Sequence, residues 1–409
     1  MHANRFTDYM YSLVKKVTDE IGPRPPCSPQ EKELGRLLVK EWKSICNKVD
    51  VETFTCSPSA FLGFIRFSAL LYFGVVISYW FVPPLSFALA VIAFSMLFFE
   101  LLRYREFVDF LFPRQQGENV IGFIRPVNEP VRRVIVGAHM DSAYEFNLIH
   151  YVRRAAIFIL VVAVLAIFIA LWVSLAKTVA YSIGYGDSTV FTALGFTMVA
   201  LTPFVGFCLF FHSGRSVPGA MDNMAGIAVI TGVGRYLSEA KTNGDWFPAR
   251  TEVVLLATSS EEAGLRGAKR YVSKHIQEMK AVPTYGLILD CIYDERFLTV
   301  SEREPCTGAR HDPHLIKMAQ NVAAEHNWPM AVSWIPIGGT DAAAFTVKGI
   351  PSICLLCMDT SKAVPNYHTR HDTYEYIRPE SLSVSLQLII DMIERIDGMQ
   401  SDLPTVIKR

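Results

Sequence analysis

The sequence predicts an α/β protein with a mostly parallel central sheet, flanked by helices and interrupted by four inserted transmembrane helices. Three observations predict this class. Strand-like and helix-like segments alternate over roughly 300 residues, as in α/β sandwiches. Several strand-like segments are almost entirely apolar, for example the VIVGAH segment at 134–139, which is typical of strands buried on both faces. Four uncharged segments of membrane length interrupt this alternation in two pairs.

The amino-terminal part of the chain is predicted to contain two amphipathic helices and one strand. The helices are expected at Phe6–Ile21 and Gln30–Ile45, where apolar residues recur at helical spacing. Ser28 is placed to cap the second helix, with Glu31 three positions later as the partner of a capping box. Val49–Thr55 alternates in polarity, as a half-buried strand does.

The rest of the predicted sheet and its helices follows later in the chain. Strands are expected at Asn119–Ile124, Arg133–Ala138, Glu252–Thr258, Tyr285–Asp290 and Pro351–Leu356, and helices at Ala225–Ser238, Leu265–Lys280, Pro313–Glu325 and Pro379–Met399. In such sheets the active site lies beyond the carboxyl ends of the strands. Polar residues at those ends are therefore the first candidates for function.

The four apolar segments form two helical hairpins. No charge occurs from Phe67 to Phe99, and Pro83-Pro84 in the middle predicts a break between two helices. Each segment has about 20 residues, enough to span a hydrocarbon core of roughly 30 Å. Buried core helices are the alternative, but these are usually shorter and amphipathic. The spans are expected at Phe61–Phe81, Leu85–Leu102, Ala155–Ala176 and Ser188–Phe211.

The charges beside the hairpins predict their orientation. The far-side links carry only Lys177 and Asp187, whereas the near ends carry several arginines. By the positive-inside rule the near ends and the catalytic part face the cytoplasm. The first residues contain no apolar h-region, so a cleavable secretory signal is not expected. The arginines at the near ends are Arg103, Arg105, Arg153, Arg154 and Arg215.

The hairpins divide the catalytic domain into three pieces. Residues 1–60 are predicted to form its amino-terminal part, 61–103 the first transmembrane hairpin, and 104–153 the continuation of the domain. Residues 154–212 form the second hairpin, and 213–409 complete the domain. The hairpins should lie close to the catalytic face, because the second one interrupts the chain between two candidate site residues, His139 and Asp222.

Composition agrees with a membrane protein. Hydrophobic residues make up 51% of the chain and charged residues 19%, which is apolar for a soluble enzyme of 409 residues. The formal net charge is zero, so a nucleic-acid partner is not expected. The eight cysteines are scattered and do not resemble a disulfide framework. Cys354 and Cys357 form a CxxC in an apolar run, which indicates strand packing more than a redox or metal site.

Five motifs with acidic or histidine side chains fall at predicted strand ends or in loops. They are GAHMDS with His139 and Asp141, PGAMDNMAG with Asp222, ATSSEEAGLRG with Glu261 and Glu262, LILDC with Asp290, and NYHTRHDT with His368 and Asp372. Each motif alone has an ordinary explanation, such as a core histidine, a helix cap or a solvated charge pair. Together they offer two histidines and three carboxylates, a set of nitrogen and oxygen donors that suits zinc.

The ordered motifs H-x-D, D-N-x-x-G, E-E-x-G-L-x-G, L-D and Y-H-T-x-x-D-T resemble those of the di-zinc aminopeptidase family. That family includes bacterial aminopeptidases, glutamate carboxypeptidase and the related glutaminyl cyclases. The IGPRPPCSPQEKELGRLL stretch near the amino terminus is similar to the opening of that family. The resemblance covers nearly the whole chain outside the hairpins.

The resemblance implies a role for each matching residue. Asp222 would bridge two zinc ions; His139 and Asp290 would complete one site, and Glu262 and His368 the other. Glu261 would be the general base that takes a proton from water and passes it to the leaving amine. Asp141 would orient His139, and Asp372 would do similar work near His368.

Departures from the family affect the expected pocket more than the expected ligands. Met221 stands where many members carry a polar residue, and Ala342 in GGTDAAAF replaces a common histidine. Arg370, Arg266 and Glu145 are pocket candidates by sequence proximity alone, and each is more simply explained as an ordinary surface charge.

These features predict a membrane-embedded zinc metallopeptidase, most simply an aminopeptidase. Its expected partners are the lipid bilayer and a peptide, lipidated or amide substrate. The alternatives are a single-zinc glutaminyl cyclase, a lipid-amide hydrolase and an inactive scaffold. Tyr367 favours the peptidase over the cyclase, which usually has tryptophan before its last histidine. Residue preference and oligomeric state do not follow from the sequence.

Overall fold

The computed structural model of the chain describes residues 2–186, 188–359 and 366–399, so the expectation for Asp187 lies outside the described residues. The chain divides into two compact units. The sheet unit consists of Met1–Pro58, Arg114–Ala143 and Ser216–Arg409, and the helical unit consists of Ser59–Pro113 and Tyr144–Arg215. Each unit is described by itself below.

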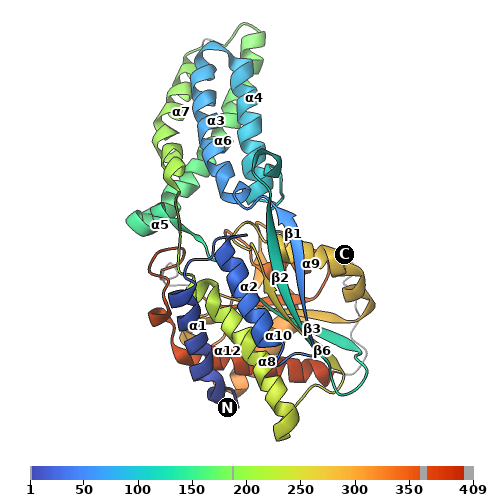
Figure 1. Cartoon of the computed structure of the whole chain (residues 1–409). Helices are drawn as coiled ribbons and strands as arrows, with labels where there is room; N and C mark the ends of the chain where they lie inside the picture. The colour runs from blue at the N-terminus through green and yellow to red at the C-terminus, as the bar shows by residue number, and fades with distance from the viewer. Residues whose placement is uncertain (1, 187, 360–365, 400–409) are drawn as a thin grey trace. The chain divides into compact units, whose positions relative to one another are not determined.

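The sheet unit is built on one mixed sheet (Figure 1). In sheet order its strands are β1 (Lys48–Cys56), β2 (Gln115–Ile124), β6 (Thr251–Thr258), β3 (Arg132–His139), β7 (Thr284–Asp290), β11 (Ser352–Cys357), β8 (Leu298–Glu304) and β10 (Ala331–Trp334), and β9 (Ala309–Arg310) pairs with β8. The four central strands β6, β3, β7 and β11 run parallel. Antiparallel pairs join β1 to β2, β2 to β6 and β11 to β8. The predicted α/β class is confirmed, with a parallel centre and antiparallel flanks.

Helices cover both faces of this sheet (Figure 1). On β3, Val134 and Val136 join one hydrophobic cluster while Ile135 joins another, since successive side chains of a strand point to opposite faces. The helices with residues in the first cluster are α1 (Thr7–Glu20), α2 (Pro29–Trp42), α8 (Ala225–Asn243), α10 (Pro313–Glu325) and α12 (Pro379–Asp397). Those with residues in the second are α9 (Arg266–Ala281) and α11 (Asp341–Thr346). Burial on both faces explains why the central strands are nearly free of polar residues.

The start of α2 follows the predicted cap only in part. The Ser28 hydroxyl accepts a hydrogen bond from the Glu31 N–H at 3.1 Å, as expected of an N-cap. The Glu31 side chain does not return to Ser28. Its two carboxylate oxygens accept from the N–H groups of Cys27, at 2.6 Å, and Ser260, at 2.9 Å. Glu31 therefore ties the start of α2 to the loop after β6.

Several elements of the sheet unit were not predicted. They are β8, β9, β10 and α11, which are short or follow one another closely. Thr299 and Ser301 interrupt the apolar pattern of β8, and α11 has only six residues. Such segments carry too few periods of hydrophobicity to be recognised in a sequence.

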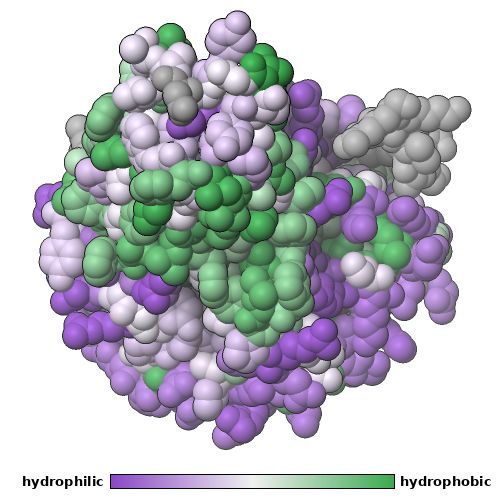
Figure 2. All heavy atoms as spheres, turned by 90° about the horizontal axis from the view of Figure 1, so that it is seen from above, coloured by the Kyte–Doolittle hydropathy of each residue, from purple (hydrophilic) through white to green (hydrophobic). Residues whose placement is uncertain are grey.

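The helical unit contains four helices that are long and apolar enough to cross a membrane. They are α3 (Ala60–Phe81), α4 (Pro83–Met96), α6 (Arg154–Ser182) and α7 (Thr189–Phe207), and the helical path of α4 continues to Leu101. Large apolar side chains such as Phe81, Phe158 and Phe196 are exposed on them. Figure 2, seen from above, shows hydrophobic residues gathered over this unit. Two short strands, β4 (Tyr144–Phe146) and β5 (His212–Ser216), and the helix α5 (Asn147–Val152) complete the unit.

One expectation for the second hairpin was wrong. The link was expected to begin at Lys177, but α6 continues to Ser182, so Lys177 lies inside the helix. Its side chain is only 5% exposed, and its ammonium lies 4.2 Å from the ring centroid of Tyr79 and 5.5 Å from that of Trp80. Attraction between the cation and the aromatic faces lets the helix include a lysine that sequence polarity placed in a loop.

Candidate metal centre

The candidate ligands meet at one edge of the sheet because three neighbouring strands run parallel. His139 is the last residue of β3, and Asp290 is the last residue of β7. Glu261 and Glu262 follow β6 after a two-residue link. β6, β3 and β7 are adjacent and parallel, so their carboxyl ends lie side by side. The expectation that function gathers at these ends agrees with this arrangement.

Asp222 reaches the same edge from an irregular turn before α8. It lies in the short helical segment Ala220–Met224, where Asp222 and Asn223 have non-helical backbone angles. The Asn223 side-chain amide donates to the backbone oxygen of Leu289 on β7, at 2.8 Å. Asp372 accepts from the N–H groups of Met221, at 2.7 Å, and Asp222, at 3.2 Å. Asp372 was expected near His368 as its orienting partner; instead its carboxylate holds the backbone of Asp222.

The two oxygens of Asp222 face two different histidines. Oδ1 lies 3.1 Å from Nε2 of His139, which is also 3.8 Å from Oδ1 of Asp290. Oδ2 lies 3.1 Å from Nε2 of His368, which is also 3.3 Å from Oε1 of Glu262. Asp222 thus stands between two groups of donors, one with His139 and Asp290 and one with His368 and Glu262.

The donor atoms fit a metal centre better than a network of hydrogen bonds. His139 Nε2, Glu262 Oε1 and Asp290 Oδ1 are buried and make no hydrogen bond of normal geometry to the described residues. Buried polar atoms are rarely left in this state. His139, Asp222 and Glu262 have donor atoms within 4.8 Å of one another. Imidazole nitrogen and carboxylate oxygen are common ligands of zinc.

The electrostatics of the cluster also call for a cation. Burial lowers the pKa of His368, but Glu262 and Asp222 outweigh burial and raise this pKa to about 10. Burial and the repulsion of Asp222 raise the pKa of Glu262. Burial raises the pKa of Asp290, and Asp222 adds to the effect. Carboxylates buried this close together repel one another, and a bound divalent cation would relieve that repulsion.

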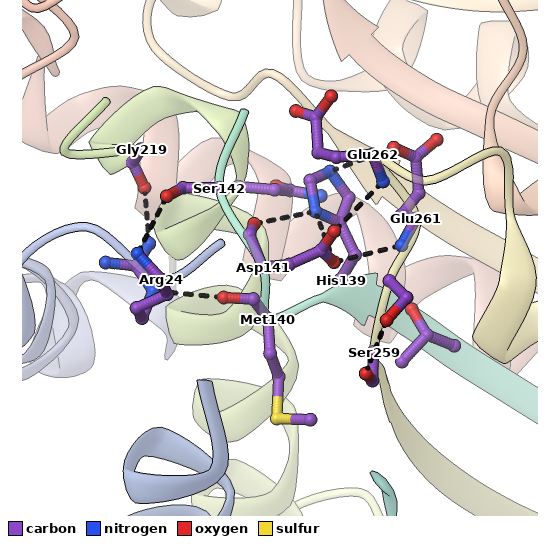
Figure 3. A network of polar contacts seen from close by, with 12 residues as sticks. Arg24, His139, Met140, Asp141, Ser142, Gly219, Ser259, Glu261 and Glu262 are labelled. Atoms are coloured by element: carbon purple, nitrogen blue, oxygen red, sulfur yellow. Dashed lines mark hydrogen bonds and ion pairs between the residues drawn. The ribbon is translucent and has the colours of Figure 1, made fainter. Parts of the chain in front are cut away.

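Asp141 contacts both the loop of Glu261 and Glu262 and the ring of His139 (Figure 3). Its two carboxylate oxygens accept from the N–H groups of Glu261, at 3.0 Å, and Glu262, at 2.9 Å. Its backbone oxygen lies 3.1 Å from Nδ1 of His139, whereas its carboxylate lies 3.5 Å away. A ring that carries its proton on Nδ1 would donate to this carbonyl and present the Nε2 lone pair to a metal.

Glu261 is buried beside the cluster without being part of either donor group. Its Oε2 lies 4.0 Å from Nε2 of His139. Burial raises the pKa of Glu261 well above its usual range, and His139 opposes this while Glu262 and Asp341 add to it. A buried carboxylate with a raised pKa, beside but outside a donor set, has the properties of a general base.

Arg24 supports the site and was not singled out from the sequence. Its side chain is fully buried and donates to the backbone oxygens of Met140, at 3.0 Å, and Gly219, at 2.9 Å (Figure 3). It also donates to the backbone oxygen of Pro218, at 3.0 Å. It therefore joins the segment after His139 to the segment before Asp222. Burial lowers the pKa of Arg24 to about 10, opposed by Asp372. The GPR triplet inside the family-like opening was the only available signal.

Two further side chains lie at the cluster and were not predicted as part of it. Asp341 is buried and accepts a hydrogen bond from the Thr258 hydroxyl. Burial raises the pKa of Asp341 to about 7, while His139 opposes this. The thiol of Cys291 lies within 4.8 Å of donor atoms of Asp222 and Asp290. Both lie within motifs already described, Asp341 in GGTDAAAF and Cys291 in LILDC.

The three pocket candidates, Arg266, Arg370 and Glu145, have different environments in the structure. Arg266 is buried and donates to the backbone oxygen of Ala263, so it is not the surface charge that was expected. Arg370 is exposed. Glu145 belongs to the helical unit and is buried. Tyr367 stacks on the ligand candidate His368, with ring centroids 3.8 Å apart.

The chain is similar to known proteins in both sequence and fold. Residues 202–393 match the family model described as Peptidase family M28. This stretch is just under half of the chain. The match includes four of the five ligand candidates, and His139 precedes it.

The whole chain is similar in fold to proteins of solved structure. A zinc aminopeptidase from Bacillus subtilis superimposes with a TM-score of 0.56 at 15% identity, covering 95% of each chain. A glutaminyl cyclase from an Acidobacteriales bacterium gives 0.55 at 13% identity, covering 96% of this chain and 94% of its own. A glutamate carboxypeptidase 2 homolog from Caenorhabditis briggsae is 26% identical over 182 residues. The chain spans only 24% of that relative's length.

The family match and the shared fold confirm the sequence-based assignment to this group of proteins. The match to Peptidase family M28 supports the predicted class of enzyme, a peptidase. Zinc is the metal named for the Bacillus subtilis aminopeptidase that has the same fold.

Proposed function

We propose that this chain is a membrane-embedded metallopeptidase, most simply an aminopeptidase, that hydrolyses an amide bond with two zinc ions and Glu261 as general base. The observation that carries this is the division of donors around Asp222. Each of its oxygens faces one histidine, at 3.1 Å in both cases. His139 and Asp290 would hold one ion with Asp222, and His368 and Glu262 would hold the other with Asp222.

The residues of the chain supply the remaining chemistry. Bound zinc lowers the pKa of water toward neutrality and polarises a carbonyl group. The Glu261 carboxylate would take the proton from the attacking water and give it to the nitrogen of the leaving amine. Asp141 would keep Glu261 in place, since it accepts from the N–H groups of Glu261 and Glu262.

We further propose that the substrate is held at the membrane. The chain has four helices long and apolar enough to span a bilayer. In the sequence one pair of these, α6 and α7, lies between His139 and Asp222, within a segment of the helical unit that starts five residues after His139, at Tyr144. A lipidated peptide, an acyl-amino acid or the end of a membrane protein would suit such a chain. The catalytic unit would face the cytoplasm, because arginines gather at the near ends of both hairpins.

The first test is the zinc content per chain of detergent-purified protein. Wild type should bind two ions, and His139→Ala should bind fewer, because it removes a ligand of one site and leaves its carboxylates in repulsion. His314→Ala is the matched control, since His314 is exposed on α10. One ion in wild type, unchanged in His139→Ala, would favour the cyclase alternative. Metal-free wild type after purification in zinc buffer would favour a scaffold.

The second test separates the substrate classes. Hydrolysis is followed for peptide amides with a free amino terminus, a blocked amino terminus and an attached acyl chain. Cleavage of the free-amine peptides alone identifies an aminopeptidase. Equal turnover with and without the acyl chain contradicts the membrane-held substrate while leaving the metallopeptidase proposal intact.

A further inference from the structure

Two cysteines of the sheet unit lie in contact, although they are 29 positions apart in sequence. Cys27 precedes α2, and Cys56 is the last residue of β1. Their sulfur atoms are 3.6 Å apart, both thiols are free, and both side chains are buried. A disulfide has a sulfur–sulfur distance of about 2.05 Å, so the gap to close is roughly 1.5 Å.

The pair lies against the loop that carries Glu261. The Cys27 sulfur is 3.2 Å from the hydroxyl of Ser260, the residue directly before Glu261. The Ser260 hydroxyl is also 3.0 Å from that of Ser259. Glu31 bridges the same two segments, because its carboxylate accepts from both the Cys27 and the Ser260 N–H groups. The segment with Cys27 is therefore hydrogen-bonded to the Glu261 loop. A disulfide at Cys27 would constrain that segment beside the loop.

We propose that Cys27 and Cys56 are a modification site at which a two-electron oxidant such as a peroxide forms a reversible disulfide, tying the start of α2 to the end of β1 beside the Glu261 loop. The Cys27 thiol gives up its proton and its sulfur attacks one peroxide oxygen. The oxygen–oxygen bond breaks, a sulfenic acid forms, and the leaving hydroxide takes up the thiol proton to become water. The Cys56 sulfur then attacks the Cys27 sulfur and expels a second water. Two thiols and one hydrogen peroxide thus give one disulfide and two waters, and a thiol reductant reverses the oxidation.

The surroundings assign the two sulfurs different roles. A hydrogen bond from Cys56 lowers the pKa of Cys27, burial opposes this, and Ser260 adds to the lowering. The same bond with Cys27, together with burial, raises the pKa of Cys56. Cys27 is therefore the sulfur that reacts first, since the thiolate is the nucleophile. Cys56 resolves the sulfenic acid because it is already in contact with it.

The test uses full-length protein in detergent, treated with graded hydrogen peroxide, then alkylated after denaturation and mapped by mass spectrometry. A peptide cross-linked through Cys27 and Cys56 should form, with a mass lower by about 2 Da, the two hydrogens lost in the sulfenic-acid and disulfide steps. Dithiothreitol should remove the cross-link. Cys27→Ser and Cys56→Ser should each abolish it. Cys46→Ser, at a half-buried cysteine elsewhere, should leave it unchanged.

Thermal unfolding gives a second readout that does not depend on catalysis. The disulfide closes a loop in the unfolded chain, so the oxidised wild type should melt several degrees higher than the reduced protein. Cys56→Ser should not respond. The proposal is overturned if Cys27 and Cys56 stay alkylatable while Cys46 is oxidised, or if their sulfurs pair with other cysteines. Neither readout depends on the substrate or on zinc.

Discussion

At the scale of single residues, the site depends on side chains that hold other groups in place. Asp222 can face two histidines because Asp372 holds its backbone and Asn223 attaches the turn to β7. Asp141 does the same for the loop of Glu261 and Glu262. Such supporting bonds fix a site to the accuracy that metal binding requires. Substituting a metal-donor residue and substituting a residue that supports it should therefore differ in their effects on zinc binding, turnover and stability.

Glu261→Gln is expected to keep zinc and lose activity. The amide has nearly the same shape but cannot accept a proton, so turnover should fall by at least about a hundredfold, the usual scale of general-base catalysis. Turnover and zinc content are measured on the same preparation. Glu262→Gln is the matched comparison and should lose zinc as well. Normal turnover of Glu261→Gln would remove this residue from the mechanism.

Arg24→Met is expected to destabilise the protein and weaken zinc binding. The change removes the Arg24 donor from the backbone oxygens of Met140, Pro218 and Gly219. The Gly219 oxygen keeps the Met224 N–H at 3.1 Å, and the Pro218 oxygen is part-buried, so the Met140 oxygen is the buried group left unpaired. A buried group left unpaired costs about 1–3 kcal/mol, which sets the expected loss of stability. Thermal unfolding and zinc titration measure both effects. Arg36→Met on the exposed side of α2 is the control and should change stability little. Equal melting of the two variants would contradict the supporting role of Arg24.

At the scale of elements, the parallel strands and the close packing behind them decide where the donors lie. His139 pairs in register with Thr258, so the loop after β6 starts level with the end of β3. The amino-terminal turn of α9 packs directly behind that loop, with the Gly267 N–H donating to the Ser259 oxygen at 3.0 Å. Only glycine fits there.

Gly267→Ala is expected to displace the Glu261 loop. A methyl group at this position would lie 2.2 Å from the Ser259 backbone oxygen and 2.6 Å from Asn119 Oδ1. Backbone atoms cannot swing away as a flexible side chain can, so the loss of stability should be at least about 1–3 kcal/mol. Thermal unfolding checks this. Gly398→Ala, whose added carbon meets nothing closer than 3.5 Å, serves as control. A melting temperature equal to that of the control would show that the loop can move at little cost.

At the scale of the whole molecule, the chain combines a sheet unit with a helical unit that exposes many large apolar side chains. Within the helical unit, polar contacts join the helices. The Tyr72 hydroxyl donates to the backbone oxygen of Met198 at 2.8 Å, and the hydroxyls of Ser86 and Ser174 lie 2.9 Å apart. Such contacts are usual between membrane helices, where the hydrophobic effect gives little association.

Labelling of Tyr185→Cys in intact cells is expected to report the orientation. Tyr185 lies between α6 and α7 and is 71% exposed, unlike Lys177. A reagent that cannot cross membranes should reach this cysteine from outside, because the arginines are expected on the cytoplasmic side. Thr242→Cys, exposed near the end of α8, should react only after lysis. The opposite pattern would invert the proposed topology.

The sequence by itself determined the fold class, the four apolar helices and the order of the five motifs. These follow from local patterns: strands buried on both faces, uncharged runs of membrane length, and short motifs at strand ends. The five candidates lie together as that order implies, while their role as ligands stays a prediction. Local patterns gave a wrong prediction for Lys177, which was expected in a loop because it is charged. It lies inside α6, where its ammonium contacts the ring of Tyr79.

The tertiary structure alone decided how the site is supported and what lies beside it. Asp372 holds Asp222 and not His368, Glu31 joins Cys27 to Ser260, and Arg24 joins two segments of the chain 79 positions apart, from Met140 to Gly219. None of these partners is near its counterpart in sequence. The physical reason is that a buried polar group takes whatever partner the packing of distant elements brings within hydrogen-bonding distance, and the order of residues along the chain does not encode that distance.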